Sequence, residues 1–448
     1  MKPQNVFICS KCDAQTPKWA GRCFECGTWG SLNEKIITKP LTSQLSTLNS
    51  QTAALKPIAL NQMIAPKAPR LKTNINEFDR VLGGGIAAGS VILLSGEPGI
   101  GKSTLLAQVC GKIATEKNAV LYTSGEESAE QVHGRFSRIG AIGAKIFFLH
   151  ETDSAAIAAT ISKELPTLTV VDSVNTLRGP GGKSGTTAEI KAAAGIISEA
   201  AKTAGVPVIL VGQVRKDGEV AGPKALEHIV DVVLSLEGDP AHSYRLLRAG
   251  KNRFGSTDEV GVFSNSETGL QEVANPSSLF LTSNANPTPG MAITALLEGS
   301  RPILCEIQAL ANKSSFGYPQ RRASGIDPRR LDMILAVLGK RAGFRLDHTD
   351  VHVNSSGGLK IRETAADLAL LLSVASACQN KAISKDIVAI GEVGLSGEVR
   401  NVKDIELRLR EARKLGFKYA IVPRSADIKP GEGILAVDSV NEALEIIK

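Results

Sequence analysis

The chain has 448 residues, of which 43% are hydrophobic and 22% charged, and its formal net charge is +7. This length exceeds what one hydrophobic core supports and favours two large domains with a small appendage. No apolar run approaches the length of a bilayer span, and the N-terminal residues lack the apolar segment of a signal peptide. We therefore expect a cytoplasmic protein with no membrane partner. The modest positive charge permits nucleic-acid binding without demonstrating it.

Four of the seven cysteines fall within the first 26 residues, as two C-x-x-C pairs ten residues apart. Two such pairs place four thiolates on two tight turns, an arrangement that suits tetrahedral zinc, and a reducing compartment favours metal over disulfides. A disulfide or redox pair is the alternative. We predict a zinc ribbon at residues 1–30, with Zn²⁺ bound by Cys9, Cys12, Cys23 and Cys26. The single cysteines are expected to be small buried hydrophobes; these are Cys110, Cys305 and Cys378.

Residues 31–70 are rich in Ser, Thr, Gln, Pro and Lys and show little periodicity, which predicts a linker that is ordered only near its end. From residue 72, short apolar runs alternate with helix-length amphipathic stretches. Buried strands are predicted at 91–95, 119–124, 145–149, 168–172 and 206–212, with helices at 102–115, 127–139, 154–165 and 188–204. This alternation indicates a parallel sheet with helices on both faces, and we assign it to a domain at 71–274.

A second α/β domain is predicted at 275–448, after the turn-rich segment NPSSLFLTSNANPTPG. Strands are expected near 290–297 and 303–309 and at KYAIVP, and helices near 328–342, 364–378, 405–415 and at the C-terminus. Three basic clusters in this domain are interpreted mostly as solvated helix faces or loops, with nucleic-acid contact as the alternative. They lie at 313–322, 329–330 and 408–414.

The strongest chemical signal is GEPGIGKST, which follows a predicted strand and opens a predicted helix. It fits G-x-x-x-x-G-K-[ST], the phosphate-binding loop of ATP- and GTP-binding proteins, whose amides and helix N-terminus face the phosphates. Lys102 would reach the β- and γ-phosphates, and Ser103 would bind Mg²⁺. The predicted nucleotide-binding residues are Gly96, Glu97, Pro98, Gly99, Ile100, Gly101, Lys102, Ser103, Thr104 and Gln213.

Polar residues at the ends of other strands complete the predicted site. Asp172 ends the run LTVVD and would be the second Mg²⁺ ligand, or else a helix cap. Glu126 and Glu127 in YTSGEES are candidates for activating water, with Glu126 preferred; either could instead favour a helix dipole. Gln213, at the tip of VILVGQ, would sense the γ-phosphate or be an ordinary strand-end glutamine.

A second motif, KNRFG, follows the predicted strand RLLRAG and comprises Lys251, Asn252, Arg253, Phe254 and Gly255. From the residues alone it is either a solvated charged turn or a source of cations for a neighbouring subunit's nucleotide site, because ring-shaped ATPases insert cations beside the γ-phosphate in trans.

Together these segments resemble the bacterial DNA-repair protein RadA (Sms) over essentially the whole chain. The CxxC…CxxCG ribbon with Trp19 and Trp29, FDRVLGGGI, GEPGIGKST, YTSGEES, VVDSVNTL, GQVRKDG and KNRFG occur in the family's order, and KNRFG is specific to it. The resemblance implies a RecA-like ATPase core joined to a domain similar to the proteolytic domain of Lon. It also implies a homo-hexameric ring that translocates on single-stranded DNA and drives branch migration of branched DNA with the RecA recombinase.

Carried over by motif, Lys102 and Ser103 belong to the phosphate loop, Asp172 to the Mg²⁺ site and Glu126 to water activation. The resemblance makes Lys251 and Arg253 coupling residues between nucleotide and DNA, acting on their own or a neighbouring subunit. It implies the cofactors ATP or ADP, Mg²⁺ and Zn²⁺.

Lon-type peptidases use a serine activated by a lysine. In the matching turn at 363–367 the serine position is Ala365, and the lysine position falls on Glu406, with Lys403 close by. Without a hydroxyl no acyl-enzyme forms, so we expect an inactive domain that serves ring assembly and DNA contact.

Three other classes compete with this interpretation. The missing dyad argues against an ATP-dependent protease. The ribbon and KNRFG argue against a signalling or clock ATPase of the KaiC type, which shares SGEES and GGGI. The intact phosphate loop argues against a non-enzymatic zinc-ribbon adaptor.

Overall fold

The structure is a computed structural model, and it divides into two compact units, residues 1–67 and 68–448. We treat each unit by itself. The residues described are 5–10, 15–16, 19–23, 28–36, 70–142, 145–181, 186–213, 223–238, 244–282, 286–314, 318–424, 428, 431 and 433–447.

The N-terminal unit contains a three-stranded antiparallel sheet in the order β2–β1–β3. The central strand β1 (Asn5–Cys9) pairs with β2 (Gln15–Thr16) and with β3 (Leu32–Ile36). The ribbon sheet therefore includes five residues assigned above to the linker, because the polar run LNEKI gives no compositional sign of a strand. The rest of that predicted linker, 37–69, lies outside the described residues.

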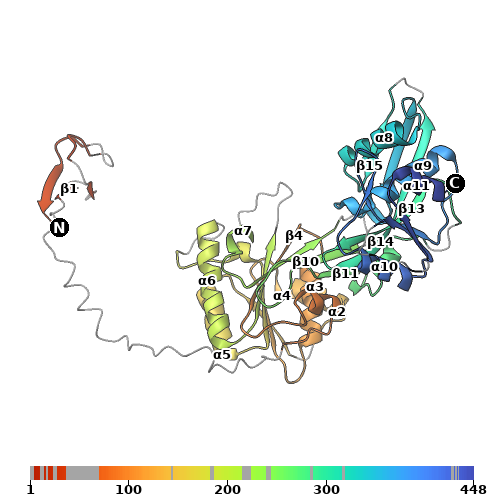
Figure 1. The fold of residues 1–448 in the computed structure, drawn as a ribbon. Coiled ribbons are helices and arrows are strands. Elements are labelled where there is room, and N and C mark those ends of the chain that lie inside the picture. Colours follow the sequence, from red (N-terminus) through yellow and green to blue (C-terminus); the bar gives the residue numbers. More distant parts are fainter. Residues whose placement is uncertain are drawn as a thin grey trace, which may run out of the picture. The chain divides into compact units, whose positions relative to one another are not determined.

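A nine-stranded sheet forms the centre of the second unit (Figure 1). Five of its strands are parallel and coincide with the predicted apolar runs, which confirms those predictions. They are β4 (Val91–Gly96), β5 (Val120–Ser124), β6 (Ile146–His150), β7 (Leu168–Asp172) and β8 (Val208–Gln213), in the order β4–β8–β7–β5–β6.

Beyond β4 the sheet continues with strands that the sequence analysis did not resolve as a group. A sixth parallel strand, β9 (Val232–Glu237), pairs with β4. It is followed by three antiparallel strands, β10 (Tyr244–Asn252), β11 (Val260–Ser266) and β12 (Gly269–Glu272). The prediction of a parallel sheet thus holds for six strands only, because successive strands joined by short turns pair antiparallel.

Helices cover both faces of this sheet, as predicted. α2 (Asn76–Val81), α3 (Lys102–Ile113) and α4 (Ala129–Arg138) share one core cluster, and α5 (Ser154–Glu164) and α6 (Thr187–Ala204) share another (Figure 1). Strand alternation in β4 supplies both clusters, since Ile92 and Leu94 belong to the first and Val91 and Leu93 to the second.

One predicted burial is wrong. The run at 145–149 was expected to be a buried strand, but β6 is the edge strand of the sheet, and the side chain of Phe147 is 57% exposed. An edge strand has a neighbour on one side only, so an apolar composition does not by itself reveal full burial. Of the single cysteines, Cys110 and Cys305 are buried as expected and Cys378 is half-buried.

The C-terminal part begins after η3 (Pro276–Leu279) and contains two main sheets. The larger one has the order β13–β14–β16–β15, and the smaller, parallel one has the order β17–β20–β21. The strands are β13 (Met291–Glu298), β14 (Arg301–Lys313), β15 (Arg321–Ser324), β16 (Thr349–Ser355), β17 (Ile387–Ala389), β18 (Glu392–Val393), β19 (Val399–Arg400), β20 (Tyr419–Pro423) and β21 (Ile434–Val437). The helices are α8 (Pro328–Ala342), α9 (Asp367–Gln379), α10 (Ile405–Lys414) and α11 (Val440–Ile446), and the predicted elements of this part are confirmed.

One hydrophobic core runs from the ATPase sheet into the C-terminal part. Tyr244 and Leu246 of β10 and Val260 of β11 belong to the same cluster of buried side chains as Leu296 of β13 and Ile303 of β14. The two halves of this unit are therefore joined by apolar packing. Within the described residues, no helix combines the length and apolarity needed to cross a membrane.

Candidate nucleotide-binding site

The phosphate loop spans the turn between β4, which ends at Gly96, and α3, which begins at Lys102. Two glycines make this turn possible. A Cβ on Gly96 would lie 2.6 Å from the Leu236 carbonyl oxygen, and Gly101 caps α3 with a left-handed φ of 112°. The loop borders a cavity of about 280 Å³, lined by Pro98, Gly99, Gly101, Lys102, Ser103, Thr104, Ser124, Glu126, Glu127, Arg135, Asp172, Val211 and Gln213.

Seven of the ten predicted nucleotide residues thus border one cavity, but Gly96, Glu97 and Ile100 do not. Gly96 ends β4, whereas the side chains of Glu97 and Ile100 line a different cavity on the other side of the loop. Gln213, at the end of β8, pairs in register with Gly96 of β4, which places it at the same edge of the sheet as the loop.

Lys102 is buried, and its Nζ donates hydrogen bonds to the carbonyl oxygens of Gly96 (2.8 Å) and Glu97 (2.9 Å). Burial lowers the pKa of Lys102, and the carboxylates of Asp172 and Glu126 oppose that shift. The ammonium is therefore surrounded by oxygen atoms beside the cavity, in the position from which a phosphate would attract it.

Asp172 ends β7 and is almost fully buried. Its Oδ2 accepts a hydrogen bond of 2.8 Å from the hydroxyl of Tyr122 in the neighbouring strand β5. Burial raises the pKa of Tyr122 well above its usual value, and the charge of Asp172 adds to the effect, so this hydroxyl remains a donor. Asp172 and the hydroxyl of Ser103 line the same cavity. Carboxylate and hydroxyl oxygens are suitable Mg²⁺ ligands, so the donor set fits this ion.

The two adjacent glutamates are held differently. Oε1 of Glu126 accepts a hydrogen bond of 2.6 Å from Oγ of Ser173, and the side chain is otherwise exposed at the cavity. Glu127 forms an ion pair with Arg135 of α4. The Glu127 carboxylate is engaged by a guanidinium, whereas that of Glu126 accepts from one hydroxyl and is exposed at the cavity, so Glu126 is the more available of the two.

KNRFG and the phosphate loop lie at opposite ends of the strands. Lys251 and Asn252 of β10 pair with Val233 and Val232 of β9, which align with the beginning of β4, whereas Gly96 ends β4. The motif is therefore several residues along the strand direction from its own phosphate loop, and its cations do not reach that loop's cavity.

Within the motif, Lys251 Nζ donates to the carbonyl oxygens of Val230 (2.7 Å) and Glu227. Arg253 forms an ion pair of 3.1 Å with the buried carboxylate of Asp231, and its side chain is still 55% exposed. Burial lowers the pKa of Lys251, with the charge of Arg253 as the next contribution.

The remaining motif residues shape the turn. Asn252 accepts a hydrogen bond from the Phe254 amide (2.9 Å), and the exposed side chain of Phe254 precedes Gly255, where a Cβ would lie 3.2 Å from Asn252 Nδ2. This part of KNRFG is a hydrogen-bonded turn from which the side chains of Arg253 and Phe254 reach the surface.

The predicted zinc site is described only in part. Cys9 and Cys23 are buried together with Ala20, and Cys9 Sγ donates to Ser31 Oγ (3.2 Å). Cys12 and Cys26 lie outside the described residues. Two buried thiols from the two C-x-x-C pairs fit the predicted ligand set as far as it is described.

In the C-terminal part, Ala365 is buried in η5 (Thr364–Ala366) against Ile405 and Leu409 of α10. Nearby, Arg408 of α10 forms a two-hydrogen-bond ion pair with Glu363 (2.6 and 2.7 Å). Arg408 is 1% exposed, so interpreting the cluster at 408–414 as a solvated face is wrong at this residue. The side chain of Lys403 is 84% exposed and pairs with Asp404, whereas Ala365 is buried.

Arg330 also departs from the expectation of a solvated cation. It forms an ion pair with Asp367, a buried residue at the start of α9. Both exceptions arise because a carboxylate distant in the chain lies opposite the cation, with the buried partner being Arg408 in one pair and Asp367 in the other.

Several residues that shape the nucleotide site were not found from the sequence. Tyr122, Ser173 and Arg135 each hold one of the predicted carboxylates, and Asp231 holds Arg253. Ser173 directly follows β7 and Asp231 directly precedes β9, but Tyr122 lies inside β5 and Arg135 inside α4, so no local sequence signal marks these two.

Three family models match the chain. The AAA domain matches residues 62–219, the subunit ChlI of Mg-chelatase matches 329–426, and the rubredoxin metal binding domain matches 7–34. Among solved structures, the RadB recombinase (22% identity) and the ATPase domain of G40P (14%) align with 45% and 46% of this chain and with 99% and 92% of their own. Their TM-scores of 0.36 and 0.40 are too low to carry an argument.

Curated relatives match over the whole chain. The DNA repair protein RadA of Bacillus subtilis is 44% identical over 99% of this chain and 98% of its own length. The proteins of the same name from Halalkalibacterium halodurans and Salmonella typhimurium are 42% and 41% identical, over 99% of this chain and 99% and 98% of theirs. With a RecA-like ATPase sheet, a ChlI- or Lon-like C-terminal domain and a matching ribbon model, the chain belongs to the DNA repair protein RadA family.

Proposed function

We propose that this protein is a DNA-stimulated ATPase that translocates on single-stranded DNA and promotes branch migration of recombination intermediates together with RecA, as a homo-hexameric ring. The observation that carries the proposal is that Lys102, Asp172 and Glu126, from three different segments, border one cavity at the phosphate loop. A lysine, a metal-binding carboxylate and a water-activating carboxylate are what phosphoryl transfer to water requires.

ATP would bind with its phosphates against the loop amides and the N-terminus of α3. Lys102 would then exchange its two carbonyl partners, Gly96 and Glu97, for the β- and γ-phosphates. The lowered pKa of Lys102 reflects burial, and a phosphate charge beside it would favour the ammonium form.

Ser103 and Asp172 would hold Mg²⁺, which supplies charge neutralisation to the phosphates when bound. Tyr122 keeps one oxygen of Asp172 engaged and so fixes the orientation of the carboxylate. The other oxygen is left for the ion.

Glu126 would accept the proton of the attacking water. Ser173 binds Oε1, which orients the carboxylate and leaves Oε2 as the accepting atom. Gln213, at the same edge of the sheet, would contact the γ-phosphate.

Lys251 and Arg253 would act outside their own nucleotide site, on DNA or on a neighbouring subunit. They lie at the end of the strands away from their own phosphate loop. This supports the assignment, because a cation there is better placed for the nucleotide site of a second subunit than for the site of its own subunit. The exposed Arg253 and Phe254 are the groups presented for such a contact.

The ribbon, with Zn²⁺ held by four cysteines, would engage DNA or a partner protein. The C-terminal domain would serve ring assembly and DNA contact rather than proteolysis, since Ala365 has no hydroxyl and the neighbouring Glu363 is engaged by Arg408.

The test is the ATPase rate of the full chain with and without single-stranded DNA, alongside its native mass. We expect DNA to increase the rate and the mass to be that of a hexamer. A rate that is unaffected by DNA would contradict the motor assignment, and degradation of casein would instead favour the protease alternative.

A further inference from the structure

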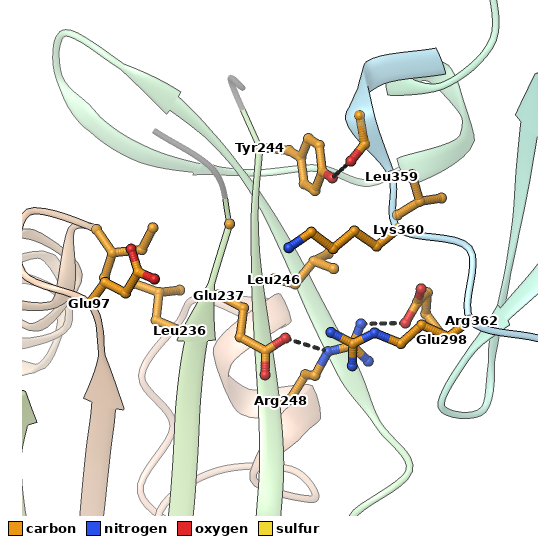
Figure 2. A pocket seen from close by; sticks show the side chains of 13 residues that line it. Glu97, Leu236, Glu237, Tyr244, Leu246, Arg248, Glu298, Leu359, Lys360 and Arg362 are labelled. Atoms are coloured by element: carbon orange, nitrogen blue, oxygen red, sulfur yellow. Dashed lines mark hydrogen bonds and ion pairs between the residues drawn. The ribbon is translucent and has the colours of Figure 1, made fainter. Parts of the chain in front are cut away.

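A second cavity, of about 380 Å³, lies on the other side of the phosphate loop, and both halves of the unit form its wall (Figure 2). The ATPase side contributes Glu97 and Ile100 of the loop together with side chains of β9 and β10. The C-terminal side contributes Glu298 and the segment 358–362. The loop that would bind phosphate and the C-terminal domain therefore line the same cavity.

Strand β10 connects the two sides because its residues alternate between faces. Tyr244, Leu246 and Arg248 line the cavity (Figure 2). Arg245, between them, is 4% exposed, and its Nε donates a hydrogen bond of 3.2 Å to the carbonyl oxygen of Ile100 in the phosphate loop.

The space for Arg245 is made by Gly238. A Cβ at this position, where φ is 154°, would lie 2.9 Å from Arg245 Cδ. The guanidinium also donates through Nη1 to the Tyr244 carbonyl oxygen at 2.7 Å, which fixes its direction. Arg245 is thus a buried cation held against the backbone of the loop.

Tyr244 connects the same strand with the C-terminal domain through two contacts. Its hydroxyl donates to the carbonyl oxygen of Gly358 at 3.2 Å (Figure 2), and its ring packs edge-to-face on Phe280 with centroids 5.0 Å apart. Two consecutive residues therefore contact the phosphate loop and the C-terminal domain.

We propose that Arg245 is a positioning residue for the phosphate loop and that Tyr244 makes the loop's position depend on the C-terminal domain. Lys102 holds the loop carbonyls of Gly96 and Glu97, and phosphates would draw its ammonium away. Arg245 then remains as the cation that keeps the Ile100 end of the loop in place. This inference rests on the proposed nucleotide site.

The experiment measures the Kd of Mg²⁺–ADP for the full chain by calorimetry, with thermal unfolding recorded without and with nucleotide. Arg245→Met should raise the Kd about tenfold, the loss expected for one hydrogen bond from a charged donor. Arg245→Lys, which keeps a cation, should recover part of this affinity. Tyr244→Phe should raise the Kd about two- to threefold, as one neutral hydrogen bond predicts.

Arg248→Met is the matched control. Arg248 faces the cavity three residues along the same strand and forms ion pairs with Glu237 and with Glu298 of the C-terminal domain. Among the described residues, no hydrogen bond or ion pair joins it to the phosphate loop. Its substitution should leave the Kd unchanged. In the double variant Tyr244→Phe/Arg245→Met the Kd should not exceed that of Arg245→Met alone, because Tyr244 acts through Arg245.

An equal loss of affinity in Arg248→Met, or multiplied effects in the double variant, would overturn the inference in favour of general loosening between domains. Unchanged Kd values in Arg245→Lys and Tyr244→Phe would also overturn it, even if Arg245→Met did not fold. Failure of the wild-type protein to bind Mg²⁺–ADP would instead contradict the proposed function, so the two failures are distinguishable.

Discussion

Ser173 donates a hydrogen bond to Glu126, with 2.6 Å between the two oxygens, and so joins the segment after β7 to the segment after β5. The neighbouring Glu127 is bound to Arg135 of α4 instead. Two adjacent carboxylates that the sequence does not separate thus have different surroundings, and this difference assigns them different expected roles.

Glu126→Gln should retain nucleotide binding and slow hydrolysis by roughly 10² or more, the usual consequence of neutralising a catalytic base. Glu127→Gln should act mainly on stability, because it removes the carboxylate that compensates Arg135. Steady-state turnover together with nucleotide affinity checks both variants. If Glu127→Gln slowed hydrolysis more than Glu126→Gln, the assignment of Glu126 as the base would be wrong.

Lys102→Ala should abolish ATP hydrolysis while the fold remains. The ammonium of Lys102 donates to the loop carbonyls of Gly96 and Glu97, and its loss removes a cation from the phosphates. The measurement is turnover, with circular dichroism as the control for folding. Near-wild-type turnover would disprove the nucleotide-site assignment.

The ribbon should contain about one zinc per chain, the stoichiometry of a four-cysteine site. Cys9→Ser should release the metal and spare basal ATP hydrolysis, because the ribbon belongs to a compact unit other than that of the ATPase sheet. DNA or partner binding should be impaired. Elemental analysis of protein purified without chelator checks the metal content, and its absence would contradict the prediction.

Lys251→Ala and Arg253→Ala should leave nucleotide binding intact and remove DNA-stimulated hydrolysis. KNRFG lies at the end of the strands away from its own phosphate loop, which supports our proposal that these cations serve another site. When Lys251→Ala subunits are titrated into wild-type protein, activity should fall faster than the mutant fraction rises, since each mutant also disables a neighbour. A linear fall, or none, would argue against coupling through this motif.

The pair Glu363–Arg408 predicts an asymmetric effect on stability. Glu363→Gln leaves the buried guanidinium of Arg408 without its compensating charge and should cost about 3 kcal/mol of unfolding free energy. Arg408→Met, which removes the buried cation, should cost less. Urea unfolding measures both free energies, and ATP turnover should remain unchanged in both variants. Equal losses of unfolding free energy would show that the uncompensated charge of Arg408 does not cause the effect.

The sequence was most informative where chemistry is local along the chain. GEPGIGKST directly follows the apolar run VILLS and includes the first residues of the next helix, so β4, the loop and the start of α3 follow from one continuous stretch of chain. Asp172 and Glu126 could be predicted because each ends an apolar run. The alternation of apolar and amphipathic segments likewise predicts the helices on both faces of the sheet.

What could not be predicted depends on which strands are neighbours. Tyr122 reaches Asp172 only because β5 lies beside β7, and 50 residues separate the two in the chain. Arg408 of α10 likewise meets Glu363, which precedes η5, across 45 residues of chain. The place of KNRFG follows from the antiparallel pairing of β10 with β9, which no local pattern reveals.

The apolar packing shared by Tyr244, Leu246 and Val260 with the C-terminal domain has a consequence for how this chain folds and can be divided. These side chains pack against partners on β13 and β14. An ATPase fragment ending near residue 275 would therefore expose an apolar surface and tend to aggregate. Residues 68–448 should accordingly melt as one cooperative body rather than as two independent domains. The C-terminal domain thus completes the interior on which the last strands of the ATPase sheet depend, and a stable fragment has to keep both.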